Sequence, residues 1–252
     1  MRLDLHLVPK RGKTIKLPKE NLYMVQAMLY GLFEKSFAEA LHDVGFKHDK
    51  RRFKLFAFSW PKGQGRPRLD GGYISFTAPL TVVVTSPMNR ILEQISGGAL
   101  CGGDLRLGQN ELECSDVKVH RPKVEGNSLK IKALSPITCY TTDPAEEGKK
   151  GYVRYHRPDE DEFVRQIDGN LRKKFSLMYP SKEIPADPIG LTPLEDPRKQ
   201  VGLFRPKDTV PIVGYWGRYR LEGPQELLQL AVDAGIGAKN PGGWGCLEVP
   251  ER

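Results

Sequence analysis

Residues 234–249 read AGIGAKNPGGWGCLEV and hold five glycines between Gly235 and Gly245. Glycine loses more conformational freedom on folding than any other residue, so a cluster this dense needs a steric reason. An apolar helical pattern precedes the stretch, and a short apolar segment follows it. The glycines are therefore expected in a loop between the last helix and the last strand, at a place where something comes close to the backbone.

The position of this loop excludes two common nucleotide-binding motifs. A dinucleotide-binding fingerprint follows a strand and opens a helix, and here Asn240 stands where its third glycine would be. A P-loop needs Gly-Lys-Ser/Thr, which is absent. A plain helix–strand loop needs only one C-cap glycine, Gly235 or Gly237. We interpret the cluster as a backbone surface pressed against a phosphate chain, with exposed N–H groups as donors.

Working outward from the loop, the first half of the chain alternates strand and helix patterns. Alternating apolar residues or β-rich composition predict strands, and an apolar face at helical spacing predicts a helix. Ser86 is the expected N-cap of the second helix, Pro87 its first residue, and Gly97 follows its end. In chain order the expected segments are a strand at 2–8, a helix within 17–35, strands at 52–60 and 72–85, a helix from 86, and a strand within 105–120.

The second half repeats this outline. The helix at 158–179 is acidic in its first turn and basic in its last, which matches the helix macrodipole. Four prolines between residues 185 and 197 predict a loop. The other expected segments are a strand or hairpin from Leu129, strands at 200–206 and 210–222, a helix at 223–235 and a last strand at 243–249.

The order β-α-β-β-α-β, found twice, predicts an α+β protein of two tandem ferredoxin-like (RRM-like) domains. The expected domains are residues 1–124 and 125–252, with a boundary near RPKVEGN at 121–127. This division rests on element order, because the halves share no clear repeat of residues.

Basic residues are concentrated in one segment. The chain has a net charge of +8, and residues 47–68 carry eight Lys or Arg against one Asp. Such a balance indicates an acidic partner such as nucleic acid. Composition alone leaves a solvated loop and a phosphate-binding surface equally open.

Cysteine usage and hydropathy argue against several classes of protein. The four cysteines form no CxxC pair, so a structural zinc site and a disulfide scaffold are both unexpected. We expect neither a metal nor a cofactor. The start of the chain has no secretory h-region, and no stretch approaches 18 apolar residues, so we expect a cytoplasmic protein without a membrane partner.

The terminal pattern resembles the signature loop of the CRISPR-associated repeat-processing endoribonucleases of the repeat-associated mysterious protein superfamily. The matching features are Gly-Ile-Gly, a short spacer with a lysine, and Gly-Gly-Trp-Gly before a terminal strand. Similar segments occur at MRLDLHLVPK, LPKENLYMVQAMLYGLF, LHDVGF followed by FKLFAFSW, and LKIKALSPI, so the resemblance covers nearly the whole chain.

The resemblance implies two ferredoxin-like domains and, as substrate, the CRISPR precursor transcript, cut once in each repeat RNA. It implies a metal-independent attack of the ribose 2′-OH on the adjacent phosphate, which leaves a 2′,3′-cyclic phosphate and a 5′-OH. The family pattern matches His42 as general acid/base, Tyr30 as the residue that orients or polarises the attacking group, and Lys54 as the cation that stabilises the transition state. Taken singly, these could also be a capping or surface histidine, a half-buried aromatic and a solvated lysine.

Geometry restricts how Tyr30 and His42 could cooperate. On one straight helix they would lie about 18 Å apart and about 120° around the axis, too far to share a phosphate. The site therefore requires a break in the helix. Ser36 and Glu39 form an S-x-x-E capping box, which predicts a new helix start, and Gly45 stands where a short second helix would end.

Some assignments remain open in the sequence. The segment between His42 and Lys54 also contains Lys47, His48 and Lys50, so His48 could replace His42, and Lys47 or Lys50 could replace Lys54. Trp244 could stack on a base, although a core position is expected. The residues expected to bind RNA are Lys50, Arg51, Arg52, Arg66, Arg68, Gly235, Gly237, Lys239, Gly242, Gly243 and Gly245.

A rival hypothesis keeps the fold and removes the catalysis. In it the chain is an RNA-binding subunit that holds a repeat-derived end inside an effector ribonucleoprotein complex. An unrelated RNA-binding ferredoxin-like module is a third hypothesis. In each case we expect a monomer or a homodimer.

Overall fold

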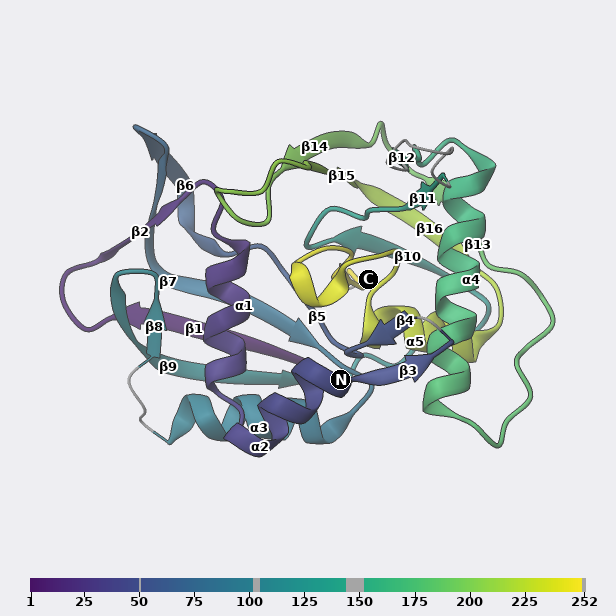
Figure 1. Cartoon of the computed structure of the whole chain (residues 1–252), viewed down its shortest axis with the longest axis horizontal. Helices are drawn as coiled ribbons and strands as arrows, with labels where there is room; N and C mark the ends of the chain where they lie inside the picture. Colours follow the sequence, from purple (N-terminus) through teal and green to yellow (C-terminus); the bar gives the residue numbers. More distant parts are fainter. Residues whose placement is uncertain (50, 102–104, 144–151, 251–252) are drawn as a thin grey trace, which may run out of the picture.

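Alternating leucines build the central strand of the first sheet. In the computed structural model, which describes residues 1–49, 51–101, 105–143 and 152–250, Leu3, Leu5 and Leu7 of β1 are all buried. Successive side chains of a strand point to opposite faces, so this alternation places one face of β1 in the core. β1 pairs antiparallel with β7 on one side and with β9 on the other (Figure 1).

The first sheet has the ferredoxin-like strand order. Its path is β2-β7-β1-β9-β8, and β5 and β6 also pair with β7. The first and third strands of the motif, β1 and β7, therefore lie in the middle, which is the arrangement of a ferredoxin-like fold. The strands are β1 (Arg2–Pro9), β2 (Thr14–Pro18), β5 (Ala57–Phe58), β6 (Lys62–Asp70), β7 (Tyr73–Thr85), β8 (Leu105–Leu107) and β9 (Asn110–His120).

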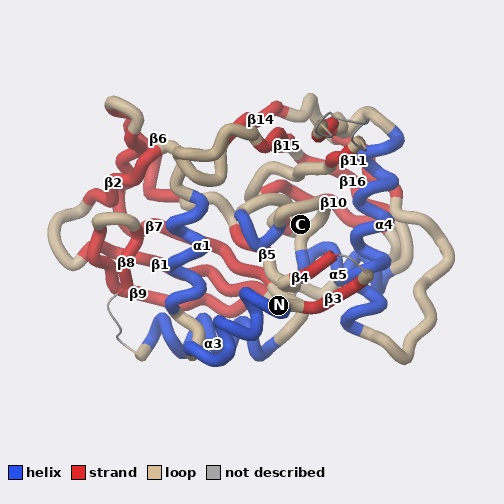
Figure 2. Tube along the Cα trace, in the orientation of Figure 1, coloured by secondary structure: helices blue, strands red, loops and turns tan. Residues whose placement is uncertain are grey.

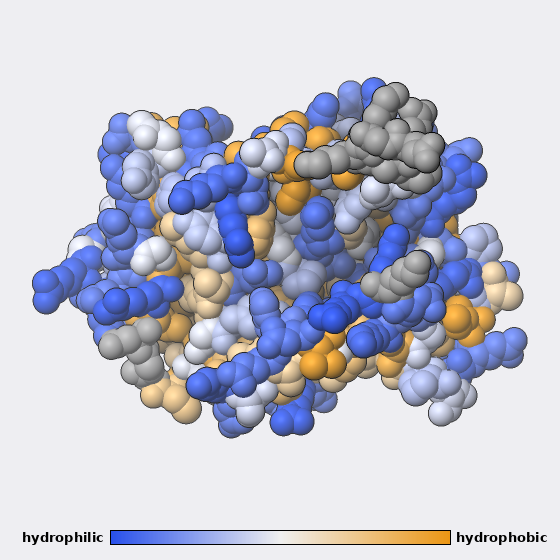
Figure 3. Space-filling model, in the orientation of Figure 1, coloured by the Kyte–Doolittle hydropathy of each residue, from blue (hydrophilic) through white to orange (hydrophobic). Residues whose placement is uncertain are grey.

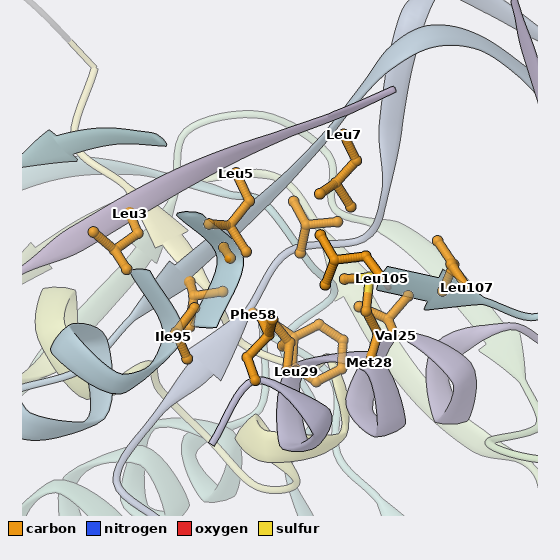
Figure 4. Close-up of a cluster of buried hydrophobic side chains, with 14 of the residues drawn as sticks. Leu3, Leu5, Leu7, Val25, Met28, Leu29, Phe58, Ile95, Leu105 and Leu107 are labelled. Carbon is orange, nitrogen blue, oxygen red and sulfur yellow. The ribbon is translucent and has the colours of Figure 1, made fainter. Parts of the chain in front are cut away.

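Helices cover the sheet and complete the first core (Figure 4). The prediction of Ser86 as N-cap and Pro87 as first residue is wrong: α3 begins at Asn89 with Met88 as N-cap and extends to Leu100, so Gly97 and Gly98 lie inside it. Close packing requires a glycine at 98, because a Cβ there would lie 2.3 Å from the carbonyl oxygen of Leu32. The helices of this half are α1 (Leu22–Gly31), α2 (Lys35–Glu39), the π-helix η1 (Ala40–Val44) and α3 (Asn89–Leu100).

The second sheet repeats the topology in the order β13-β16-β10-β17. One prediction is wrong here: the proline-rich segment contains the edge strand β13, and Pro193 ends that strand. A proline can occupy an edge strand because it removes a donor that the sheet does not need. The final strand is also shorter than expected. The strands are β10 (Ser128–Ala133), β13 (Gly190–Pro193), β16 (Arg218–Glu222) and β17 (Leu247–Glu248).

Three two-stranded ribbons supplement the two sheets. They are β3 (Phe46–His48) with β4 (Arg51–Phe53), β11 (Tyr140–Thr142) with β12 (Val153–Tyr155), and β14 (Arg198–Gly202) with β15 (Ile212–Trp216). The strand expected at 52–60 is thus broken into β4 and β5. The connection from β14 to β15, tan in Figure 2, reaches from the second half of the molecule toward α1.

The second half places two helices, α4 (Asp161–Met178) and α5 (Gln225–Ala234), against its sheet. The acidic first turn of α4 is as predicted, but its last turn contains no basic residue. Val124, in the connection between β9 and β10, packs into the second core. The domain boundary at 124/125 lies in this connection and stays a prediction. No helix in the described part of the chain is long and apolar enough to cross a membrane.

The glycine-rich loop joins the two halves and contains the short 3-10 helix η2 (Asn240–Gly242). Trp244 belongs to the second half in sequence but is fully buried in the first core, as expected for a core tryptophan. The Trp60 indole N–H donates to the Gly243 carbonyl oxygen at 2.8 Å. Cys246 packs with Ala57 and Val83 in a small cluster between the halves. The loop is therefore part of the interface between the two units.

A buried lysine of α4 holds the glycine-rich loop in place through hydrogen bonds. Lys174 of α4 is 2% exposed, and its ammonium donates to the carbonyl oxygens of Ala234 (3.2 Å) and Gly235 (2.8 Å) and to Oδ1 of Asn240 (2.7 Å). The amide of Asn240 in turn donates to the carbonyls of Ile236 and Trp244, each at 2.9 Å. Lys174 thus caps the C-terminal end of α5, where unpaired carbonyls concentrate negative charge.

We expect Lys174→Met to destabilise the protein strongly. Methionine fills a similar volume but leaves three buried oxygens without a donor, and each such loss costs about 1–3 kcal/mol. Urea unfolding should show the loss, while the matched change Lys173→Met, at the partly exposed neighbour, should have little effect. Equal midpoints for Lys174→Met and wild type would contradict the role assigned to this ammonium.

The same lysine predicts a pH dependence of stability. Burial lowers the pKa of Lys174 to about 7 in the folded chain. From about pH 7 to about pH 10 the unfolded state then binds more protons than the folded state, so the free energy of unfolding rises with pH. Urea unfolding across this window should show a smaller rise for Lys174→Met than for wild type. Equal rises would show that Lys174 keeps its proton throughout.

Candidate active site

A break in the first helix brings Tyr30 and His42 together. Their ring centroids lie 5.7 Å apart at an interplanar angle of 83°. The predicted break is present, but the capping box is not its cause: α2 begins at Lys35 with Glu34 as N-cap, and no side chain caps it. Ser36 and Glu39 lie inside the new helix.

Helix α3 fixes the break instead. The backbone N–H of Glu34, at the start of α2, has no partner within the helix. It donates to Oε1 of Gln94 at 2.9 Å. Gly98 lets the backbone of Leu32 approach α3 closely. The helix break therefore depends on the turn itself and on Gln94 and Gly98, more than 50 residues away. Sequence reasoning missed these two distant residues.

Two cations hold the end of the segment that carries His42. The Lys54 ammonium donates to the carbonyl oxygens of Leu41 and His42, and the Arg52 guanidinium donates to that of Asp43 at 2.5 Å. Carbonyls at a helix C-terminus lack partners within the helix, so cations at this end stabilise it. Gly45, in the left-handed region at φ 57°, ends η1 as predicted.

A carboxylate orients His42. Nδ1 of His42 lies 2.7 Å from Oδ1 of Asp43, and both side chains are about 70% exposed, at 72% and 71%. A carboxylate on Nδ1 favours a proton there, which leaves Nε2 as the nitrogen that faces a substrate. This pairing can therefore prepare the imidazole for proton transfer.

The neighbouring groups differ in their protonation. Burial raises the pKa of Tyr30 to about 12, so its hydroxyl keeps its proton near neutral pH and can donate a hydrogen bond. The pKa of Lys54 is lowered by burial and by the nearby Arg52 guanidinium. Tyr30 thus suits orientation or polarisation rather than proton abstraction.

A cleft of about 770 Å³ contains Tyr30 and His42. One wall is the face of α1 and α2–η1, and the other comes from the connection between β14 and β15, which belongs to the second half of the molecule. This connection supplies Arg205 and Lys207, cations that sequence reasoning missed because it placed residues 200–206 in a strand. The lining residues are Tyr23, Gln26, Ala27, Tyr30, Ala38, Glu39, His42, Asp43, Arg205, Pro206 and Lys207.

Lys54 does not line this cleft. It lines a separate recess of about 500 Å³ together with Arg51, Arg52 and Lys239. Four of the residues expected to bind RNA, Arg51, Arg52, Gly237 and Lys239, therefore gather in one basic recess around Lys54. Figure 3 shows hydrophilic side chains around the hollow in the middle of this face.

The basic segment 47–68 does not form one surface. Arg66 and Arg68 are on β6, far from α2–η1 in Figure 1, so the structure does not bring these two expected RNA-binding residues to the cleft. Lys50 lies outside the described residues. Lys47 and His48 are on β3 and do not line the cleft, which leaves His42 as its histidine among the described residues.

Protein atoms, rather than a phosphate chain, account for the crowding at the glycines. A Cβ on Gly245 would lie 1.9 Å from the Ile236 carbonyl oxygen, and one on Gly243 would lie 2.8 Å from the Phe58 ring. Gly235 and Gly237 are similarly enclosed, so the steric explanation in the sequence analysis is wrong for these four. Gly242 is partly exposed, and Lys239, at φ 59°, is exposed.

Metal ligands do not gather in the described part of the chain. No group of three or more His, Cys, Asp or Glu side chains in those residues could hold a metal ion.

Comparison with known proteins places the chain in a family. The family profile "CRISPR associated protein Cas6, C-terminal" matches residues 119–249. The CRISPR-associated endoribonuclease Cas6 1 of Methanocaldococcus jannaschii is 26% identical over 97% of this chain and 91% of its own length. The CRISPR-associated endoribonuclease Cas6 of Pyrococcus furiosus is 24% identical over 99% of this chain and 90% of its own length.

Solved structures share the fold over the whole chain. A CRISPR-associated protein Cas6 superposes with a TM-score of 0.78 at 22% identity, covering 100% of this chain and 99% of its own. A RAMP protein described as binding different RNA substrates gives a TM-score of 0.80 at 20% identity, covering 100% of both chains. With its two tandem ferredoxin-like domains and its matching C-terminal half, this chain belongs to the CRISPR-associated Cas6 family.

Proposed function

We propose that this chain is an endoribonuclease that cuts CRISPR precursor transcripts within the repeat to produce mature guide RNAs. The observation that carries the proposal is the meeting of Tyr30 and His42 in a cleft whose other wall presents Arg205 and Lys207. A proton-transfer group, a hydrogen-bond donor and cations around one space suit cleavage of a phosphodiester. The names of the two curated relatives support RNA as the substrate class.

The proposed reaction is a transesterification that needs no metal ion. The ribose 2′ oxygen attacks the adjacent phosphorus, and the bond from phosphorus to the 5′ oxygen of the next nucleotide breaks. The 2′ hydroxyl loses its proton and the leaving 5′ oxygen gains one. The products are a 2′,3′-cyclic phosphate and a 5′-OH, so atoms and charge balance without an added reactant.

His42 is the general acid/base in this scheme. Its Nε2 is free because Asp43 lies at Nδ1, and its side chain is exposed to the cleft. Tyr30, which keeps its proton, donates a hydrogen bond that orients or polarises the attacking group. Asp43 acts through His42 and is a positioning residue.

The cations have two different tasks in this proposal. Lys54 was expected to stabilise the transition state, but its ammonium contacts the backbone of η1 and lines another recess. We assign it the task of holding η1 in place. Arg205 and Lys207 line the cleft itself, and no carboxylate within 4 Å pairs with either among the described residues. They are suited to face the charge of the pentacoordinate phosphorane.

Electrostatic attraction guides the RNA strand to the cleft. The recess with Arg51, Arg52 and Lys239 adjoins the glycine-rich loop and offers positive charge to phosphates that flank the cut. Gly242 and Lys239 are the parts of that loop open to such a contact. An effector ribonucleoprotein as further partner, a monomeric or homodimeric state and a cytoplasmic location are further parts of the proposal.

Cleavage of repeat RNA in EDTA tests the proposed chemistry. We expect the RNA to be cut in EDTA, and a single 2′-deoxy substitution at the cut to abolish cutting because it removes the attacking oxygen. His42→Ala should lower the single-turnover rate by about 10²–10⁴-fold, the usual contribution of a general acid or base. Asp43→Asn should lower it less and should alter its pH profile.

One result would contradict this scheme, and a second experiment would assign the role of His42 within it. Tight binding of the correct repeat RNA without cutting would favour the rival, an RNA-binding subunit without catalysis. An RNA with a 5′ bridging sulfur at the cut separates the roles of His42, because sulfur leaves without protonation. Restored cutting by His42→Ala would make His42 the acid, and a persistent defect would make it the base.

The division of labour among the cations gives a separate prediction. Arg205→Gln and Lys207→Gln should each lower the rate at saturating RNA by about 10²-fold, as expected for loss of a group that stabilises transition-state charge. The same substitutions at Arg198 and Lys199, on the same ribbon but outside the cleft, are the matched controls. If only Lys54→Gln lowered this rate, without loss of stability, Lys54 would be the phosphate-facing cation.

A further inference from the structure

We propose that a second recess, beside the His42 cleft, receives one unpaired nucleobase of the RNA from a nucleotide next to the scissile phosphate. The recess has a volume of about 720 Å³ and lies between η2, the β11–β12 ribbon and the β14–β15 connection. This inference rests on the proposed RNA substrate, and it adds to it a subsite for a single base.

Aromatic side chains form the walls of the recess. Tyr140 of β11 and Tyr155 of β12 lie with ring centroids 5.6 Å apart, and Phe204 lies on the β14–β15 connection. All three are partly exposed and line the recess. Unstacked bases of single-stranded RNA bind by stacking on such rings, with modest dependence on sequence.

The charge of the recess suits a strand of RNA. The Lys239 ammonium lies 5.3 Å from the centroid of the Tyr140 ring, and Lys207 also lines the recess. The acidic residue of the lining, Asp208, is engaged, because its carboxylate accepts the Arg205 backbone N–H at 2.9 Å. Aromatic surface with cations at its rim favours a base joined to phosphates over an alkyl chain or a cationic ligand.

An unused donor lies in the wall. The indole N–H of Trp244 is buried and has no hydrogen-bond partner among the described residues. Its neighbouring carbon, Cδ1, is 3.9 Å from where a Gly242 Cβ would be, and Gly242 also lines the recess. A buried donor without a partner is costly, and a base edge carries the acceptors that an aliphatic ligand lacks. Thr142 and Thr209 add hydroxyl groups to the lining.

The recess is within one nucleotide of the proposed catalytic groups. Gln26 and Lys207 line both the recess and the cleft, so the two spaces lie next to each other along α1. Gln26 precedes Tyr30 by one helical turn, a rise of about 6 Å. The Gln26 side-chain amide is fixed between them by a hydrogen bond to the Pro241 carbonyl at 2.6 Å. A base in the recess would thus hold the adjoining phosphate beside His42.

Repeat RNAs that lack one base test this subsite. A series carries an abasic ribose at one position after another around the cut, and a 2′-deoxy at the cut prevents cleavage. We expect removal of the base at one position to weaken binding about 5- to 150-fold, which corresponds to the loss of one stacked base. 2-Aminopurine at the same position should change its fluorescence on binding.

Protein variants then locate the base. Tyr140→Leu or Tyr155→Leu should weaken binding of intact RNA and abolish the fluorescence change, but should leave binding of the abasic RNA nearly unchanged. Tyr73→Leu, on the exposed β6–β7 hairpin, is the matched control and should have no effect. Since the abasic series uses the wild-type chain, it stands even if a variant fails to fold.

The outcomes separate this inference from the proposed function. Cleavage of intact RNA with no position sensitive to base removal, or equal weakening by Tyr140→Leu for intact and abasic RNA, would overturn the base subsite alone. If the RNA is not cut but base removal at one position still weakens binding, the proposed nuclease activity would be overturned and the base subsite would be retained.

Discussion

The buried ammonium of Lys174 is the interaction on which the shape of the molecule depends. It satisfies the end of α5 and the Asn240 side chain, and the Asn240 amide closes the glycine-rich loop through two further hydrogen bonds. That loop places Trp244 in the core of the other half, where it meets Trp60 with ring centroids 5.9 Å apart. A single buried amino group, hydrogen-bonded to three oxygens, thus connects α4, α5, the loop and the first sheet. Because buried polar groups without partners are costly, the network specifies one arrangement of the two halves.

This arrangement determines which residues can meet on the open face. The first half provides Tyr30 and His42 from a broken helix, and the second half provides Arg205, Lys207 and the aromatic recess from two ribbons. Neither half contains the whole set. The glycines serve the same end, since their missing side chains allow the loop to lie directly against Phe58 and against its own backbone. The steric constraint at the loop is internal, while its outward side carries Lys239.

The sequence predicted those features that depend on local pattern. Leu3, Leu5 and Leu7 show the alternation of a strand with one buried face, and the order of elements predicted two ferredoxin-like units. The features that it missed depend on contacts between distant residues. β13 forms by pairing with β16, which is distant in sequence, although Pro193 alone favours a loop. Gly98 is inside α3 because of Leu32, and Lys174 is buried because of Asn240. Such contacts cannot be predicted from the local amino-acid composition. For the candidate site, pattern could propose Tyr30 and His42, whereas Arg205 and Lys207 approach them only through the tertiary fold.

The positions of the cations explain why the two halves of the molecule have different tasks at the cleft. Lys54 and Arg52 donate hydrogen bonds to the carbonyl oxygens at the end of η1, those of His42 and Asp43. Their positive charge therefore faces the protein backbone. A phosphate beside His42 then needs cations from elsewhere, and those on the β14–β15 connection lie across the cleft. Groups on opposite walls can contact a phosphate from two sides, which a single short helix cannot do. The connection that carries these cations also carries Phe204, which packs 3.6 Å from where a Gly242 Cβ would be. The network centred on Lys174 therefore fixes, through the glycine-rich loop, the distance between Tyr30 and His42 on one wall and the charges that face them on the other.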